Sequence, residues 1–411
     1  KKEEDIMKKF NKFLSVAVAS AMVMAMAGCG NTDNGSAATG TNAATESAAA
    51  SDSAASGSVF KIGGIGPTTG GAAVYGLAVQ HGAEIAVEEI NAAGGINGYQ
   101  VEFKFQDDEA DAEKSVNAYN ALKDWGAQII DGSTTSGACI AVTDKTKEDN
   151  MFQITPSGSA VECVQYDNNF RVCFSNPNQG LASAQYIGEN GLAEKIAVIY
   201  DSSDVYSSGI YEKFAKEAEN QPFEIVAAEA FTADNKTDFS VQLQKAKDAG
   251  ADMVFLPIYY QESALILTQA AAMGYAPKWF SCDGMDGILG GVDNFDVSLT
   301  EGVMLLTPFA ADATDDLTQS FVTKYKEKYG DTPNQFAADS YDAIYVIKAA
   351  IEKSGVTPDM SVSDICDGMK AAMTEITVDG LTGSGMTWTA DGEANKAPKA
   401  VVIENGAYKA M

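Results

Sequence analysis

The sequence predicts an α/β protein with two lobes, each built on a mainly parallel sheet. Short apolar runs alternate with amphipathic stretches from about residue 60 to residue 404, which is typical of parallel strands joined by helices. The chain has 411 residues, of which 45% are hydrophobic and 21% charged, and this is enough for two domains with cores of their own.

The stretch 60–108 predicts a strand, a helix and a second strand in succession. An apolar run at 60–65 is followed by the cluster GPTTGG, which cannot continue a strand. Apolar or small residues then recur at helical spacing, at Val79, Gly82, Ala83, Ala86 and Ile90. A Gly-Gly pair ends this helix, and alternating apolar residues at 101–105 predict the next strand. The first loop therefore lies beyond the carboxyl end of a strand, where open α/β sheets bind ligands.

The same alternation continues along the chain. Further strands are predicted at 127–130, 151–154, 170–174, 195–200, 223–229, 252–257, 279–282 and 302–307, with short strands and turns at 380–388 and 399–404. Further helices are predicted at 112–125, 137–149, 179–190, 208–220, 239–246, 263–273, 315–329, 335–354 and 362–374.

Composition excludes several classes of function. The net charge of −29, from 57 acidic and 28 basic residues, argues against nucleic-acid binding, which needs clustered Lys and Arg. The single histidine, His81, lies in a predicted helix and is interpreted as a structural or surface residue, so acid–base catalysis and metal binding are not expected. The early glycines miss the G-x-G-x-x-G spacing, and no G-x-S-x-G motif occurs. We therefore expect no enzyme, no catalytic residue, no cofactor and no metal.

The amino-terminal residues have the layout of an export signal. Three lysines follow Met7, the expected start, and an apolar stretch at 13–27 ends in Met-Ala-Gly-Cys29. This ending resembles a bacterial lipobox, which implies cleavage after residue 28 and lipid attachment to Cys29. Residues 30–58 are almost all small or polar and predict a flexible tether. We expect residues 1–28 to be the export signal and residues 29–58 the lipidated cysteine and its linker.

Several motifs in a fixed order are similar to a known family. KIGGIGPTTGGAAVYG, GAEIAVEEINAAGGINGYQVEF, ITPSGSA and FRVCFSNPNQG resemble the type I periplasmic-binding fold. Within this fold the chain is similar to the leucine/isoleucine/valine-binding branch of ABC-transporter solute-binding proteins. The resemblance covers residues 59–411. It implies two Rossmann-like lobes, a hinge of several crossovers and a ligand in the cleft between the lobes. The implied lobes are 59–178 with 308–384, and 179–307 with 385–411.

The resemblance places part of a ligand site on the first lobe. It implies that Ser136 binds the α-carboxylate of an amino acid at the start of a helix, where unpaired N–H groups favour an anion. A helix-capping serine that binds no ligand is the alternative. The backbone of Ser157 would contact the ammonium, and the hydroxyl of Ser159 the ammonium or the carboxylate. Tyr75 would border the pocket for the ligand side chain.

The second lobe would supply the other half. Tyr206 and Tyr259 match aromatic residues that face the cleft, with Tyr260 as the alternative if the register differs by one. Asp283 matches the acid that pairs with the α-ammonium. The family members compared carry glutamate there, and Asp286 lies only three residues further on. The choice between the two acids stays open.

The resemblance also implies the partners. A monomer anchored to the outer face of the bacterial cytoplasmic membrane would deliver an amino acid, branched-chain or similar, to ABC permease subunits. The alternative is a sensory receptor of the same fold that binds an amide or another small polar solute. The chain shows no transmembrane helix or signalling domain after the α/β region, which favours the transporter component.

Five cysteines follow Cys29, so at least one should stay a free thiol if no other chain takes part. Cys163 and Cys173 flank a predicted turn and could form a disulfide, as in many exported proteins. No C-x-x-C motif or His/Cys cluster indicates a metal site.

Overall fold

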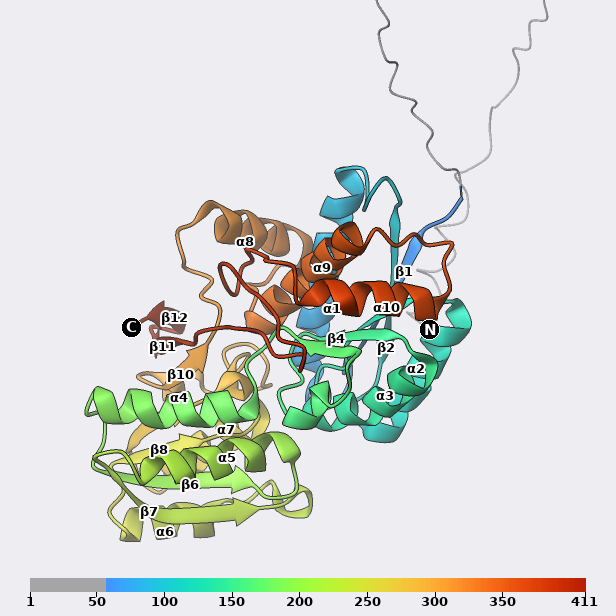
Figure 1. Ribbon diagram of the computed structural model, residues 1–411. Helices are drawn as coiled ribbons and strands as arrows, with labels where there is room; N and C mark the ends of the chain where they lie inside the picture. Colours follow the sequence, from blue (N-terminus) through green and yellow to red (C-terminus); the bar gives the residue numbers. More distant parts are fainter. Residues whose placement is uncertain (1–56) are drawn as a thin grey trace, which may run out of the picture. The chain divides into compact units, whose positions relative to one another are not determined.

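A computed structural model describes residues 57–411. The predicted export signal, the lipidated Cys29 and nearly all of the linker lie outside these residues. Within them the chain forms two α/β lobes, each with its own sheet (Figure 1). None of the helices in residues 57–411 combines the length and the apolar character needed to cross a bilayer.

The first sheet has five strands in the order β2-β1-β3-β4-β5, and every pair is parallel. Its strands are β1 (Phe60–Gly66), β2 (Val101–Asp107), β3 (Ile129–Asp131), β4 (Phe152–Thr155) and β5 (Asn169–Arg171). Apart from the edge strand β2, the strands are buried almost throughout, as expected for a parallel sheet with helices on both faces. Their carboxyl ends all lie at one edge, which is where the loops that follow β3 and β4 meet.

Helices cover both faces of the first sheet. Consecutive residues of β3 point to opposite faces: Ile129 packs in the core beneath α1 (Ala73–Ala92) and α9 (Gln335–Ser354), and Ile130 in the core beneath α2 (Ala112–Trp125) and α3 (Ser136–Asp149). Two further helices, α8 (Asp316–Tyr329) and α10 (Val362–Met373), pack against α1 and α9 respectively. Gly82 allows the close approach of α1 to α9, because a Cβ there would stand 2.0 Å from the carbonyl oxygen of Ala337.

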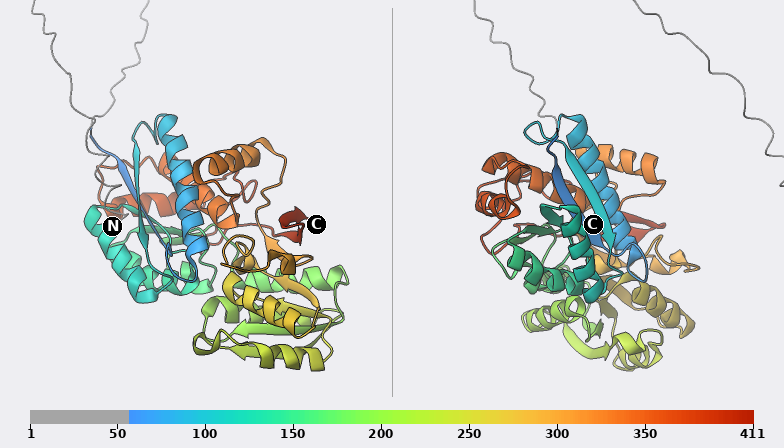
Figure 2. Two further views of the ribbon diagram at one scale, coloured as in Figure 1. Left: turned by 180° about the vertical axis from the view of Figure 1, so that it is seen from behind. Right: turned by 90° about the vertical axis from the view of Figure 1, so that its right-hand side faces the viewer.

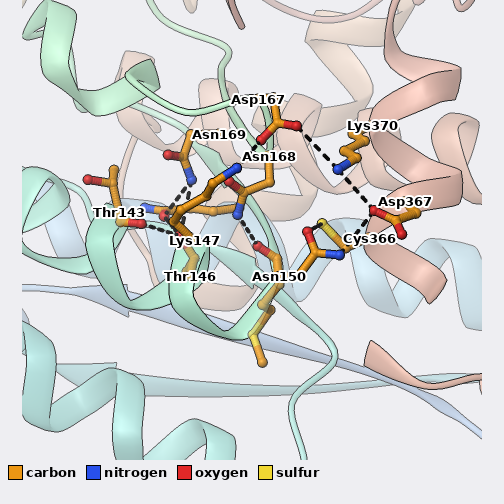
Figure 3. Close-up of polar contacts among 12 residues, drawn as sticks. Thr143, Thr146, Lys147, Asn150, Asp167, Asn168, Asn169, Cys366, Asp367 and Lys370 are labelled. Carbon is orange, nitrogen blue, oxygen red and sulfur yellow. Dashed lines mark hydrogen bonds and ion pairs between the residues drawn. The ribbon is translucent and has the colours of Figure 1, made fainter. Parts of the chain in front are cut away.

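A polar network attaches α10 to the first lobe (Figure 3). Asp167, in the turn before β5, accepts Lys147 Nζ of α3 at 2.6 Å and Lys370 Nζ of α10 at 3.2 Å. Asn150, which ends α3 in the left-handed conformation, donates from Nδ2 to Asp367 Oδ1 at 3.0 Å. Figure 3 shows these side chains converging from three separate segments of the chain. They are exposed ion pairs and amides, so they contribute little stability individually.

The second sheet has seven strands in the order β12-β11-β10-β9-β8-β6-β7. Its strands are β6 (Lys195–Asp201), β7 (Glu224–Phe231), β8 (Met253–Leu256), β9 (Lys278–Ser281), β10 (Met304–Thr307), β11 (Lys399–Glu404) and β12 (Ala407–Ala410). The first five are parallel, whereas β11 and β12 form an antiparallel hairpin on the β10 edge. Helices α4 (Asn176–Glu189) and α5 (Val205–Ala218) pack on one face, and α6 (Ser240–Asp248) and α7 (Tyr260–Ala272) on the other (Figure 2).

The chain passes between the two sheets after β5, after β10 and before β11. The last passage lies beside the first sheet: Trp388 Nε1 donates to the Arg171 carbonyl at 2.8 Å, and the Arg171 N–H donates to the Gly392 carbonyl at 3.0 Å. Lys396, in the same passage, forms a buried ion pair with Asp339 of α9 at 2.7 Å. We therefore propose that the lobe boundary lies nearer to residue 397 than to the predicted residue 384.

Most predicted elements agree with the structure, but α4, α5 and α7 each begin three residues before the predicted start, and two segments near the carboxyl end also differ. Helix α4 begins at Asn176, three residues before the predicted start, because Ser175 caps it and Pro177 fits its first turn. Residues 380–388 form only isolated bridges instead of a strand. Strand β12 was not predicted, since an exposed four-residue edge strand has no apolar face to reveal it.

The sequence leaves open whether Cys163 and Cys173 form a disulfide, and in the structure both are free buried thiols. Cys163 Sγ faces α3, where it lies 3.7 Å from the Ser136 carbonyl oxygen. Cys173 follows β5. Burial raises the pKa of its thiol, and the charges of Asp339 and Lys396 at the hinge also affect this pKa. The spacing across the turn is short, but the two side chains point to different neighbours.

Candidate ligand-binding site

Side chains of both lobes enclose a small cavity at the carboxyl ends of the strands. The residues around it are Tyr75, Thr134, Thr135, Ser136, Ser157, Tyr206, Tyr259, Asp283, Gly284 and Phe336. The space left between them is about 10 Å³, which is at or below the size of one water molecule. The two lobes therefore close on each other tightly at this point.

The first-lobe side of the cavity is built from the start of α3. Thr135 is the N-cap residue and makes no capping bond through its side chain, so the alternative prediction of Ser136 as the cap is wrong. Ser136 instead joins two loops: its Oγ accepts the N–H groups of Ser159 and Ala160, each at 3.2 Å. Ser159 Oγ lies 3.5 Å from Ser136 Oγ. The two predicted hydroxyls therefore lie side by side behind the helix start, an arrangement suited to an anion.

The loop after β4 is held by its own side chains. Ser157 Oγ donates to the Thr134 carbonyl at 2.6 Å, so this hydroxyl is used within the protein. Thr155 Oγ1 accepts the Gly158 N–H at 2.7 Å and donates to the Ser133 carbonyl at 2.7 Å. These bonds fix the path of the loop without a ligand. Within this loop, backbone groups and the Ser159 hydroxyl remain available to a ligand.

Asp283 forms the second-lobe side. It lies in the short 3₁₀ helix η3 (Asp283–Met285) after β9, and it is only 5% exposed. Tyr206 donates its hydroxyl to Asp283 Oδ1 at 2.6 Å, and Gln179 donates from Nε2 to Oδ2 at 2.9 Å. Burial nevertheless raises the pKa of Asp283 to about 7, because removal from water disfavours the charged form more than these two donors favour it.

Aromatic rings fill the space between the two halves. Tyr206 and Tyr259 stack with ring centroids 5.0 Å apart, and Tyr75 packs on Tyr259 and Phe336 at 5.5 Å and 4.4 Å. Tyr75 belongs to α1 of the first lobe, yet its hydroxyl donates to the Gly284 carbonyl and accepts the Tyr260 N–H at 3.1 Å. Tyr259, and not Tyr260, lines the cavity.

Asp286 lies in a different environment from Asp283. Its Oδ2 accepts the Gln335 N–H at the start of α9 at 2.9 Å, and burial raises its pKa to about 6. It lines a separate pocket of about 440 Å³ together with Tyr408 of β12. Asp283 is thus the acid that faces the cavity, and Asp286 holds the turn to α9.

A larger pocket of about 390 Å³ adjoins the cavity at the mouth of the cleft, and Thr135 and Tyr259 line both. The charged residues that line this larger pocket are Glu109, Asp201, Asp204, Lys236 and Glu262. Burial raises the pKa of Asp204 to about 6. Thr135 Oγ1 is buried and has no hydrogen-bond partner within residues 57–411. The mouth of the cleft is therefore polar and mainly acidic.

Sequence reasoning missed several residues around the cavity. Thr134 and Thr135 stand in the same short segment as Ser136 and could have been included on that ground. Gln179 lies within the motif FRVCFSNPNQG but was not selected, whereas Phe336 comes from the start of α9, far from the other motifs, and no local pattern indicates it. Within the described residues, no group of three or more His, Cys, Asp or Glu side chains is arranged to hold a metal ion.

Two α/β lobes, a multi-crossover hinge and a polar and aromatic cavity between the lobes define a cleft-type binding protein for small solutes. The sequence agrees with this class. A profile of the family described as periplasmic binding protein matches residues 59–407, and the chain belongs to this family.

Relatives of known name support the assignment. The Leu/Ile/Val-binding protein homolog 3 of Brucella melitensis is 30% identical over 300 residues, which are 72% of this chain and 80% of the relative. The leucine-, isoleucine-, valine-, threonine-, and alanine-binding protein of Pseudomonas aeruginosa is 30% identical over 302 residues, 72% of this chain and 78% of the relative.

A solved structure is also similar. The branched-chain amino acid transporter substrate binding protein LivJ of Streptococcus pneumoniae, in complex with isoleucine, has a TM-score of 0.77 and 28% identity. The match covers 86% of this chain and 99% of the other. Its fold confirms the predicted arrangement of two lobes with parallel sheets.

Proposed function

We propose that this protein is the extracytoplasmic substrate-binding component of an ABC importer and binds an α-amino acid between its lobes. The observation that carries the proposal is the pairing of Ser136 and Ser159 on one lobe with the buried Asp283 on the other. A zwitterion needs hydroxyl and N–H donors at its carboxylate and an acid at its ammonium. The cavity offers both at opposite ends.

Closure of the lobes would depend on this ligand. The carboxylate binds at the start of α3, where helix N–H groups and the Ser136 hydroxyl face it. The ammonium binds Asp283, which becomes ionised because a neighbouring positive charge outweighs the cost of burial. Each lobe alone satisfies only one end of the ligand, so the closed form gains stability when both ends are present.

The aromatic walls favour an aliphatic side chain. Tyr75, Tyr206, Tyr259 and Phe336 surround the space beyond the two charged groups. The relatives named above are described as binding leucine, isoleucine and valine, and the pneumococcal protein holds isoleucine. A branched-chain or similar amino acid is therefore the expected ligand.

Delivery to a permease follows from the change of shape. Only the closed form brings the outer surfaces of both lobes together, so permease subunits can distinguish it from the open form. We further propose that the export signal and lipidated Cys29, predicted from sequence, anchor the protein as a monomer to the outer face of the cytoplasmic membrane. Replacing Cys29 with alanine should release the protein into the medium, whereas retention in the membrane fraction would contradict the anchor.

A calorimetric titration tests the ligand. Protein unfolded and refolded to remove any carried ligand is titrated with the twenty common amino acids, small amides, simple carboxylates and sugars. Leucine, isoleucine or valine should bind with micromolar or tighter affinity. Heat from a sugar or a simple carboxylate, with none from any α-amino acid, would reject the proposed ligand class.

A further inference from the structure

Two buried cysteines lie directly beneath the loop after β4 that carries Ser157 and Ser159, which we call the serine loop. Cys139 is in the first turn of α3, three residues after Ser136, and Cys163 is in the 3₁₀ helix η1 (Val161–Val164), four residues after Ser159. Both have an exposed fraction of 0%, and with Ala160 they form a small cluster separate from the main cores.

The contacts of each sulfur place it between α3 and the loop region that follows β4. Cys139 Sγ lies 3.0 Å from the position that a Cβ on Gly158 would take, so the sulfur packs directly on the loop. Gln153 Nε2 approaches Cys139 Sγ at 3.6 Å from the sheet side. Cys163 Sγ donates to the Ser136 carbonyl at 3.7 Å, in the same turn of α3 as Cys139.

Each of the two thiols also shifts the pKa of the other. Burial raises the pKa of both groups, but the pKa of Cys139 is lowered overall because the Cys163 thiol, the Thr155 hydroxyl and the Arg171 charge favour its thiolate. The pKa of Cys163 is raised, first by burial and then by Cys139. Two thiols in one cluster, one with a lowered pKa, are an arrangement from which a disulfide can form by thiol–disulfide exchange.

Both cysteines are free thiols in the structure, and we propose that oxidation joins Cys139 and Cys163 in a disulfide that links the start of α3 to η1 beneath the serine loop. Both S–H bonds break and one S–S bond forms. The two protons and two electrons pass to a disulfide oxidant, such as oxidised glutathione, which is reduced to two thiols. Because both sulfurs are buried, the oxidant reaches them while the chain folds. The proposal does not depend on the identity of the ligand.

The other described cysteines lie elsewhere. Cys282 Sγ is 3.6 Å from Ser183 Oγ in the second lobe, and Cys366 Sγ donates to Asn150 Oδ1 at 3.5 Å beside α10 (Figure 3). Cys173 lies at the hinge, where burial raises the pKa of its thiol and the charges of Asp339 and Lys396 also affect this pKa. Only the pair Cys139 and Cys163 shares one cluster.

The disulfide would close a loop that carries Ser157 and Ser159. Closing a loop of this length stabilises a protein mainly by restricting its unfolded chain. It would also hold the Ser159 and Ala160 N–H groups against Ser136 Oγ, to which both donate at 3.2 Å. Hydrogen exchange at these two amides should therefore slow when the bond is formed.

The test is refolding of the full chain in a glutathione redox buffer and, in parallel, in excess reductant. Peptide mapping by mass spectrometry should find the peptides of Cys139 and Cys163 linked, with a mass lower by two hydrogens, in the oxidised sample alone. The oxidised protein should unfold roughly 5 °C or more above the reduced one. The oxidation state of Cys29 is monitored separately, through the peptide that contains it.

Matched variants decide the pairing. Cys163→Ala and Cys139→Ala should each abolish the linked peptide and the thermal gain, whereas Cys173→Ala should keep both. Five free thiols among residues 57–411 after oxidative refolding, or a link between Cys163 and Cys173, would overturn the proposal. A thermal gain that persists in the Cys163→Ala variant would also overturn it.

Discussion

The two halves of the cleft differ in what they contribute. The first-lobe half is neutral and already assembled, since Ser136, Ser157 and Ser159 take part in hydrogen bonds within their own lobe. The second-lobe half contains a buried acid, Asp283, whose pKa is raised to about 7 by burial. One half thus provides fixed geometry, and in the proposed binding mode the ligand ammonium sets the charge of the other half.

The largest effect is expected from removing the acid. Asp283→Asn keeps the shape of the side chain but leaves the ligand ammonium without a negative partner, so the affinity for leucine should fall by at least about 30-fold. Calorimetry measures the loss. Asp286→Asn is the matched control, because Asp286 accepts the Gln335 N–H outside the cavity, and its affinity should change by less than about threefold. A larger loss of affinity in Asp286→Asn than in Asp283→Asn would assign the ammonium contact to Asp286.

The raised pKa of Asp283 predicts a pH dependence. The folded protein holds this proton more tightly than the unfolded chain does, so Asp283 lowers the free energy of unfolding as pH rises from about 4 to about 7. Ligand binding needs the ionised form, and affinity should therefore weaken by up to about tenfold for each pH unit below the pKa. Titrations between pH 8 and pH 5.5 measure this slope. A slope that is unchanged in Asp283→Asn would assign the proton to another group.

A smaller effect is expected on the neutral side. Ser136→Ala removes the acceptor of the Ser159 and Ala160 N–H groups and the hydroxyl expected to bind the carboxylate, so affinity should fall by about tenfold. Ser157→Ala serves as the control, since its hydroxyl donates to the Thr134 carbonyl. Equal losses of affinity in both variants would mean that the Ser136 hydroxyl at the helix start makes no specific contact with the carboxylate.

The smallest effect on affinity is expected from Tyr75→Phe. This change removes the two bonds that the Tyr75 hydroxyl makes with Gly284 and Tyr260 of the other lobe but keeps the ring. Because a ligand supplies new contacts between the lobes, affinity should change by about threefold or less. The ligand-free protein should nevertheless open more, which small-angle scattering detects as a larger radius of gyration. An unchanged radius would show that other contacts hold the lobes together.

Local patterns predicted most of the fold. Helices 112–125 and 335–354 have the predicted bounds, because both carry a regular apolar face and clear end signals. The edge strand β12 and the bridges of 380–388 were not predicted correctly, since β12 is short and exposed and residues 380–388 make only isolated bridges instead of a ladder.

The site was predicted from the family resemblance more than from local pattern. The resemblance selected seven residues, and the structure brings all of them to one cavity or directly behind it. Their contacts with a ligand stay a prediction. Phe336 was missed because its place opposite Tyr75 depends on how α9 packs on α1. The pairing of Cys163 and Cys173 stayed open at the level of sequence because spacing along a turn does not fix the direction of a side chain, and both are free thiols in the structure.

The tightness of the cavity has a consequence for kinetics. With about 10 Å³ of free space, the closed form admits no amino acid, so every association event must wait for the lobes to separate. At low ligand concentration the observed association rate should rise in proportion to concentration. At high concentration it should level off at the rate of opening, and this plateau, measured by stopped-flow fluorescence, reports how fast the empty receptor can sample its surroundings.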